Sequence, residues 1–181
     1  MDPEKQEKEV WMAMSSLEHK AAAPRSVGCM VITVSDTRTE ETDKSGRLMR
    51  ELLSQANHPV QLYRIVKDEP AEITAAIDEG ASHPEVQVIL LNGGTGISPR
   101  DNTCEAVQRL LEKEMPGFGE LFRMLSYTED IGSAAMLSRA VAGTYRGKAV
   151  FSTPGSTGAV RLAMTRLILP ELGHVVRELN R

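Results

Sequence analysis

Aromatic residues are scarce in this chain: they make up only 4% of its 181 residues, so a core has to be built from aliphatic side chains. Hydrophobic residues reach 41% and charged residues 25%, which is typical of a globular protein rather than a disordered one. The length suits one ordinary domain. These totals favour an aliphatic core of the kind that stacked helices and parallel strands form.

Cysteine and unbalanced positive charge are also scarce. Cys29 and Cys104 are the only cysteines, and two isolated cysteines form neither a disulfide framework nor a zinc-binding pattern, so we expect free thiols. The net charge of −4, with no dominant basic stripe, argues against a nucleic-acid partner. A local cationic pocket for a small anion is still compatible with this balance.

Long apolar runs are missing. No stretch reaches the roughly 20 apolar residues that a membrane span requires, and the N-terminus carries no apolar segment of the signal-peptide type. We therefore expect a cytoplasmic protein without a membrane partner. Residues 1–25 are polar and charged apart from a short "VWMAM" patch, which predicts a flexible N-terminal arm before a single domain over residues 26–181.

Strand and helix patterns alternate along this predicted domain. Apolar runs rich in β-branched residues predict strands, and apolar residues at helical spacing predict helices. The expected strands are 27–35, 60–66 and 86–92, with two short ones around Arg146-Gly147, and the expected helices are 43–58, 71–82, 102–114, 117–128, 131–140, 156–169 and 171–179, the last two separated at Pro170. The alternation predicts a three-layer α/β/α fold with a mostly parallel central sheet.

In a sheet of this kind the strands end at a common edge, where ligands bind. The segments that follow the four main strands are "SDTR" from Ser35, "KDEP" from Lys67, "NGGTG" from Asn92 and "TPGST" from Thr153. We therefore expect Asp36, Asp68, the glycines, Asp101 and Ser156 to gather at this edge.

The stretch "NGGTGISPRD" places three glycines within four residues directly after the third strand. Glycine permits positive φ and leaves backbone N–H groups uncovered, and such a loop before a helix offers several donors to a phosphate. The stretch is not a Walker A loop, which needs Gly-Lys-Ser/Thr, nor a dinucleotide fingerprint, which needs a third glycine near Pro99. The alternative is a tight strand-to-helix turn without a ligand.

Two acids, Asp68 and Asp101, flank this predicted anion site. Carboxylates repel phosphates unless a cation lies between them, and Mg²⁺ is typically held by one or two carboxylates plus substrate phosphates. The pair therefore suggests a magnesium-dependent nucleotide site. In the alternative interpretation each aspartate only caps a helix N-terminus, while Asn102 and Glu105 have the spacing of a capping box.

Other polar residues could serve the same edge. Ser156 and Thr157 in "TPGST" can cap the following helix or donate to a phosphate. Arg100, Arg139 and Arg161 are candidate anion partners, and Arg139 stands among apolar neighbours in "LSRA". Each arginine is also compatible with a surface role.

Three longer segments carry a family resemblance: "LLNGGTGISPRDNTCEAV", "EMPGFGELFRMLSYTEDIGSAAMLSRAVAG" and "STPGSTGAV". Together they resemble the MoaB/MogA family of molybdenum cofactor biosynthesis proteins, with a likeness that runs from about residue 26 to the end. The resemblance implies a molybdopterin-binding fold of three layers, assembled as a homotrimer or hexamer. It also implies a reaction in which molybdopterin and MgATP give adenylylated molybdopterin and pyrophosphate, the product then passing to an enzyme that inserts molybdate.

The resemblance also implies roles for particular residues. Asp68 and Asp101 match the two carboxylates that serve catalysis and bind Mg²⁺. The loop that binds the nucleotide and its phosphates corresponds to Gly93, Gly94, Thr95 and Gly96. Segments on the substrate side, where the pterin binds, correspond to Asp36, Pro154, Gly155 and Ser156.

One position departs from the family pattern. The family usually reads "TPEA" where this chain reads "TCEA", so Cys104 replaces a first-turn proline, which we interpret as a packing substitution. Two other functions compete with the adenylyltransferase: a non-enzymatic scaffold or carrier of molybdopterin, and an unrelated phosphate-binding α/β module with no affinity for the pterin. The presence of both Asp68 and Asp101 favours the enzyme.

Overall fold

The sheet has the predicted, mostly parallel arrangement. A computed structural model describes residues 24–181, so most of the expected N-terminal arm lies outside the described residues. The sheet order is β2-β1-β3-β6-β5-β4, and the strands are β1 (Cys29–Val34), β2 (Val60–Val66), β3 (Val88–Asn92), β4 (Lys113–Glu114), β5 (Val141–Tyr145) and β6 (Lys148–Thr153). Pairing is parallel among β2, β1, β3 and β6, whereas β5 runs antiparallel to both β6 and β4.

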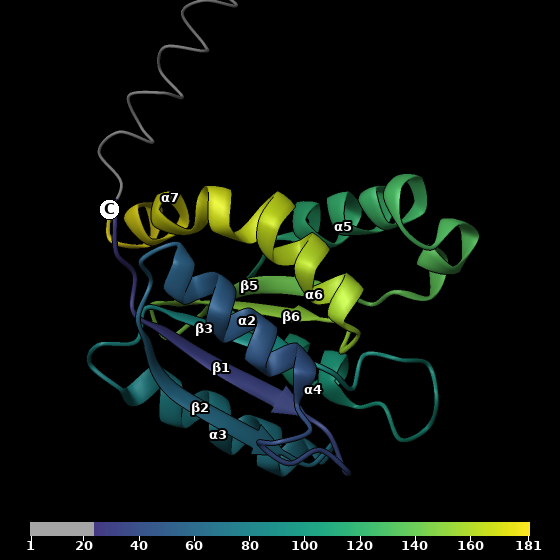
Figure 1. The fold of residues 1–181 in the computed structure, drawn as a ribbon. Helices are drawn as coiled ribbons and strands as arrows, with labels where there is room; N and C mark the ends of the chain where they lie inside the picture. Colours follow the sequence, from purple (N-terminus) through teal and green to yellow (C-terminus); the bar gives the residue numbers. More distant parts are fainter. Residues whose placement is uncertain (1–23) are drawn as a thin grey trace, which may run out of the picture.

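Helices cover both faces of the sheet, which confirms the three-layer prediction. One face carries α2 (Lys44–Gln55), α5 (Pro116–Glu129), α6 (Thr157–Ala163) and α7 (Leu169–Leu179), and the other carries α3 (Pro70–Ser82) and α4 (Thr103–Leu110) (Figure 1). Each face buries its own cluster of apolar side chains. The central strands β1 and β3 are buried along their whole length and read as nearly continuous apolar runs, because both of their faces are covered.

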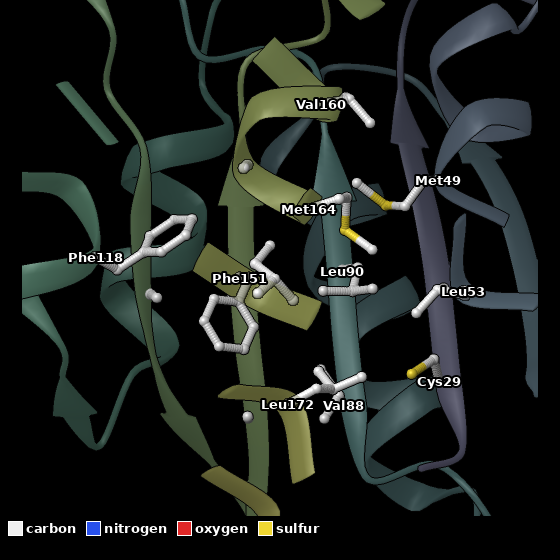
Figure 2. Packing of buried hydrophobic residues seen from close by; sticks show 14 of the residues in the cluster. Cys29, Met49, Leu53, Val88, Leu90, Phe118, Phe151, Val160, Met164 and Leu172 are labelled. Carbon is white, nitrogen blue, oxygen red and sulfur yellow. The ribbon is translucent and has the colours of Figure 1, made fainter. Parts of the chain in front are cut away.

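The larger core cluster is mostly aliphatic, as the composition predicts. Met49 and Leu53 of α2, together with Val160 and Met164 from the C-terminal helices, lie over Leu90 of β3 (Figure 2). All five side chains are fully buried. Burial of side chains of this size stabilises the fold by roughly 1.5–3 kcal/mol each. This packing holds α2 and α6 against the sheet.

The short hairpin around Arg146-Gly147 forms as predicted. Arg146 has φ of 48° and Gly147 has φ of 74°, and positive φ at both central residues is the signature of the two-residue turn that matches strand twist. The turn joins β5 to β6, with Tyr145 opposite Lys148.

The predicted helix 102–114 is wrong in its last four residues. α4 ends at Leu110, and Lys113 and Glu114 form β4 instead. The backbone N–H of Glu112 donates to the carbonyl of Thr144 at 2.8 Å, and that of Met115 donates to Ala142 at 2.7 Å. Pairing with the open edge of β5 therefore overrides the local helix propensity of the charged residues.

Two other expected helices differ in form. The segment 131–140 contains only a 3₁₀ helix, η1 (Gly132–Leu137), before an extended approach to β5. The expected break at Pro170 is absent, because a π-helical turn, η2 (Met164–Ile168), connects α6 directly to α7. Pro170 then stands in the first turn of α7, where it has no N–H to donate to the preceding turn, and the π-helical turn lies immediately before it.

Within residues 24–181 no helix combines the length and apolar character needed to cross a membrane.

Candidate functional site

A cleft of about 310 Å³ opens at the carboxyl edge of the sheet, beside the ends of β3 and β6. Its lining residues are Gly93, Gly94, Thr95, Gly96, Asp101, Leu137, Ser138, Pro154 and Gly155. The strand order reverses nearby, since β1 lies between β2 and β3, and ligands in open α/β sheets bind at such a switch point. The structure therefore brings the four residues of the glycine segment, Asp101, Pro154 and Gly155 into one cleft.

Gly93 and Gly94 make the tight turn that follows β3, with φ of 103° and 61°. A Cβ on Gly93 would overlap the carbonyl of Val34, and one on Gly94 would overlap the side chains of Thr103 and Asp68. Both positions thus require glycine, for conformation and for space. The turn lets the Asp68 carboxylate approach the backbone of the cleft wall directly.

Asp68 is buried, with 5% of its surface exposed, although it follows an edge strand. Its Oδ1 accepts hydrogen bonds from the backbone N–H of Asn102 at 3.1 Å and from the hydroxyl of Thr103 at 3.3 Å. Burial raises the pKa of Asp68, as do the nearby charges of Asp101 and Asp36, and the two hydrogen bonds only partly oppose this. Asp68 therefore supports the start of α4 and also lies in a cluster of negative charge.

Asp101 is more exposed and is held by its own loop. Its Oδ2 accepts from the backbone N–H of Ser98 at 2.9 Å and from the Ser98 hydroxyl at 2.6 Å. These bonds, with smaller contributions from the N–H of Gly96 and the charge of Arg139, outweigh partial burial and lower the pKa of Asp101. Because these donors belong to the loop, Asp101 does not cap a helix, and the capping interpretation fails for it.

Asp36 pairs with Arg100 instead of lining the cleft. The Arg100 guanidinium contacts both Asp36 oxygens, at 2.8 and 3.0 Å, and also pairs with Glu69 at 2.5 Å. The Arg100 hydrogen bonds, helped by the N–H of Asp68, lower the pKa of Asp36. Arg100 therefore ties the loop after β3 to the loops that follow β1 and β2.

Arg139 contacts the backbone of the β3–α4 loop (residues 93–102) through its guanidinium. Its guanidinium donates to the carbonyls of Thr95 at 3.1 Å and Asp101 at 3.2 Å, and also to the carbonyl of Gly96. A further contact pairs it with the Glu105 carboxylate. Arg139 is thus engaged with the protein, which differs from the anion-binding role considered for it from sequence.

The expected capping box between Asn102 and Glu105 does not form. The side-chain amide of Asn102 donates to the carbonyls of Asp68 and Arg100, and Glu105 pairs with Arg139. Tertiary contacts at this helix start replace the local cap that the spacing predicts.

The loop after β6 is simpler. Gly155 packs against Gly93, where a Cβ would come within 2.9 Å of the Gly93 Cα. Ser156 caps α6 by accepting from the N–H of Ala159 at 3.1 Å, and it is exposed and absent from the cleft lining. Arg161 is exposed on the same helix. Of the second loop, only Pro154 and Gly155 face the cleft.

A buried polar chain lies beneath this edge, and sequence reasoning missed it. Asp43 is fully buried at the start of α2, and it accepts from the hydroxyls of Thr33 and Tyr63, both at 2.5 Å. Burial alone raises the pKa of Asp43, but its hydrogen bonds outweigh this and lower it. Thr33 in turn accepts from the amide of Asn92 at 3.0 Å. This series of hydrogen bonds fixes Asn92, the last residue of β3, immediately before the glycine turn.

The remaining sequence predictions concern the cysteines and metal ligands. Cys29 and Cys104 are free and buried, which confirms free thiols, and burial raises the pKa of Cys104 to about 11. Its Sγ donates to the carbonyl of Arg139, so it acts as a packing residue. In the described part of the chain, no group of three or more His, Cys, Asp or Glu side chains could hold a metal alone.

Sequence reasoning also missed two residues that line the cleft together with the glycine segment, Leu137 and Ser138. Leu137 is the last residue of the 3₁₀ helix η1 and Ser138 follows it, and the position of this helix relative to the glycines depends on the sheet and not on local spacing. Their adjacency to Arg139 in "LSRA" was the one signal available.

Fold and cleft together define an α/β/α protein with a glycine-lined cleft and two neighbouring carboxylates at the carboxyl edge of its sheet. The family described as "Probable molybdopterin binding domain" matches residues 30–174. The chain therefore belongs to the MoaB/MogA family of molybdenum cofactor biosynthesis proteins, as the sequence motifs predicted.

Individual relatives agree over nearly the whole chain. Molybdenum cofactor biosynthesis protein B of Bacillus cereus is 62% identical over 168 residues, which are 93% of this chain and 99% of that protein. A crystal structure of a molybdenum cofactor biosynthesis protein B superposes with a TM-score of 0.86 at 62% identity, covering 88% of this chain and 99% of that one. The tungsten cofactor synthesizing protein MoaB from Pyrococcus furiosus gives 0.79 at 39% identity, covering 88% of this chain and 100% of that one.

Proposed function

We propose that this chain adenylylates molybdopterin with MgATP and releases pyrophosphate. One observation carries the proposal: Asp101 lines the same cleft as the glycine segment, and Asp68 lies directly behind Gly94. Backbone donors suited to phosphates and carboxylates suited to a cation thus meet at one place. Membership of a molybdenum cofactor family supports molybdopterin as the second substrate.

The two aspartates fit Mg²⁺ by the chemistry of their surroundings. Burial, with smaller contributions from the charges of Asp101 and Asp36, raises the pKa of Asp68, and a cation here would relieve the repulsion among these carboxylates. Mg²⁺ usually keeps several waters and takes one or two protein carboxylates plus substrate phosphates. Asp68 and Asp101 would therefore hold the ion, which supplies charge stabilisation at the phosphates.

The reaction needs little acid–base chemistry from the protein. A molybdopterin phosphate oxygen attacks the α-phosphorus of ATP, a new P–O bond forms, and the bond to the bridging oxygen of the β-phosphate breaks. Pyrophosphate leaves with that oxygen. A phosphate is already ionised at neutral pH, so positioning and charge stabilisation account for catalysis. The glycine segment would bind the nucleotide phosphates, and Pro154 and Gly155 the pterin side, with Asp36 and Ser156 beside them.

The test is turnover of molybdopterin and MgATP by purified protein, followed as pyrophosphate and adenylylated pterin. We expect Asp68→Ala and Asp101→Ala to fold and to lose turnover, and the exposed control Glu85→Ala, which precedes β3, to retain it. Unchanged turnover in Asp101→Ala would remove that residue from catalysis. Molybdopterin binding without product by the intact chain would favour the non-enzymatic scaffold, and no binding would favour an unrelated phosphate-binding module.

We also propose self-association, as a homotrimer or hexamer. Large apolar side chains are exposed on α5 and η1 and close to the cleft: Ile97, Leu121, Met124, Tyr127, Ile131, Met136 and Leu137. Monomers rarely expose so many large apolar residues together, which favours a protein contact. Light scattering should give the mass of a trimer or hexamer for the wild-type protein. Replacement of Met124 by Lys should lower the mass of the assembly. A monomeric wild-type protein would contradict this proposal.

Two further expectations follow from the pathway. We propose that the protein works in the cytoplasm and passes adenylylated molybdopterin to a molybdate-inserting enzyme. Relatives named for molybdenum cofactor biosynthesis support the pathway, and retention of the product by the purified protein after turnover would be the first sign of such a transfer.

A further inference from the structure

We propose that Arg139 is the positioning residue of the site, and that it orients both aspartates through two peptide groups of the β3–α4 loop. The inference rests on the proposed function for its kinetic effect but on geometry for its structural effect. Arg139 lies between η1 and β5, outside the loop that it holds. Its backbone directly follows Leu137 and Ser138, which line the cleft.

The guanidinium ties the two ends of the loop together. It donates to the carbonyls of Thr95 and Gly96 at the start of the loop and to the carbonyl of Asp101 at its end. Residues 96–100 between these points are exposed, so few packing contacts fix them. A planar fork with several donors can hold such divergent carbonyls at once, whereas a Lys ammonium cannot reproduce its geometry.

The peptide groups carry this constraint to the aspartates. The described residues contain no cis peptide, so the N–H of each peptide group points away from its carbonyl. The carbonyl of Thr95 shares a peptide group with the N–H of Gly96, and Gly96 lies directly beside the Asp101 carboxylate, since a Cβ on Gly96 would come within 2.6 Å of the Asp101 Oδ2. The carbonyl of Asp101 shares one with the N–H of Asn102, which donates to Asp68 at 3.1 Å.

Arg139 therefore sits on the carbonyl side of two peptide groups whose N–H sides serve the two carboxylates. Loss of the guanidinium would let both peptide groups rotate, so the Asp68 and Asp101 contacts would weaken together. Misplacement of reacting groups by about 1 Å can cost roughly 100-fold in rate. A positioning role thus predicts a fall in kcat with little change in the KM of molybdopterin.

The experiment compares Arg139→Gln, Arg139→Lys and two controls. Glu105→Gln removes the ion pair with Arg139 but leaves its carbonyl contacts, and Arg109→Gln removes an exposed cation further along α4. We expect kcat to fall at least about tenfold in both Arg139 variants and less than about threefold in both controls, since roughly 1.4 kcal/mol corresponds to each tenfold step. Added guanidinium ion should partly restore Arg139→Gln but not Arg139→Lys.

Hydrogen exchange of the Gly96 and Asn102 amides supplies a readout that does not depend on turnover. We expect exchange at both amides to accelerate together in Arg139→Gln and to stay at the wild-type rate in Arg109→Gln. Wild-type exchange at both amides in a folded Arg139→Gln would overturn the proposal. If the wild-type protein has no turnover, the proposed function fails while the exchange data still decide the role of Arg139.

Discussion

The two small-residue loops at the carboxyl edge are built in opposite ways. The β3–α4 loop is held by side chains from distant segments, including Arg139, Asp68 and Asp36. The β6–α6 loop (residues 154–156) is held mainly by its own helix cap, in which Ser156 accepts from Ala159. Tertiary restraint on an exposed loop costs conformational entropy, so its concentration around the aspartates supports the proposal that this loop carries the chemistry.

The largest expected effect comes from breaking the restrained loop at its turn. Gly94→Ala places a Cβ at φ of 61° against Asp68 and Thr103. We expect the free energy of unfolding to fall by roughly 1–3 kcal/mol from backbone strain alone, and turnover to fall about 100-fold as Asp68 is displaced. Chemical denaturation and pyrophosphate release would measure these two effects.

Its control is Gly158→Ala beyond the other loop, where the nearest atom to the new Cβ, an Asp130 oxygen, is 3.5 Å away. We expect this helical substitution to stabilise the fold by at most about 1 kcal/mol and to leave turnover unchanged. Equal losses in the two variants would refute the contrast between the loops.

A smaller effect is expected within the restrained loop from Ser98→Ala. The change removes the hydroxyl that donates to Asp101 at 2.6 Å and keeps the backbone N–H donor at 2.9 Å. One hydrogen bond to a charged group contributes roughly 1.5–3 kcal/mol, so the pKa of Asp101 should rise and turnover should fall about tenfold. Carboxyl NMR titration and kinetics would detect both, with the exposed Ser133→Ala as control.

Ser156→Ala tests the self-capped loop. Loss of the cap on α6 should lower the free energy of unfolding by about 1 kcal/mol, with kcat unchanged because Ser156 does not line the cleft. Thermal denaturation and steady-state kinetics give the two numbers. A higher KM for molybdopterin would confirm the pterin contact that the family resemblance implies, whereas a loss of kcat comparable to that of Ser98→Ala would contradict the contrast.

The contrast also explains how far sequence reasoning reaches. Buried strands, the hairpin at Arg146-Gly147 and the need for glycine after β3 follow from local periodicity and turn chemistry. The strand ends also predict that Asp68 and Asp101 lie close to the glycine segment, which the structure confirms. Neither route predicts the contacts of Arg139, because its partners stand 34 to 44 residues away. The same reason applies to β4, where pairing with a distant strand replaces a local helix.

The smallest effect concerns charge around Asp68. Burial raises the pKa of Asp68, and the Asp36 charge adds to this, so Asp36→Asn should bring that pKa down. For a carboxyl with a raised pKa, the stabilising contribution is present below the unfolded pKa and is lost as pH rises through the folded one. The free energy of unfolding of the variant should therefore fall less as pH rises through the pKa of Asp68. Binding of Mg²⁺, which needs the ionised Asp68 carboxylate, should persist to lower pH.

Carboxyl NMR titration of wild type and variant, with and without Mg²⁺, measures the shift directly. Asp78→Asn is the matched control, since Asp78 lies on α3 and contacts Tyr145 and Arg146 instead of the site. An Asp68 pKa that is unchanged or higher in Asp36→Asn would mean that the Asp36 charge does not contribute to it. In that case Asp36 and Asp68 would not act as one electrostatic unit, and only the charge of Asp101 would favour a cation beside Asp68.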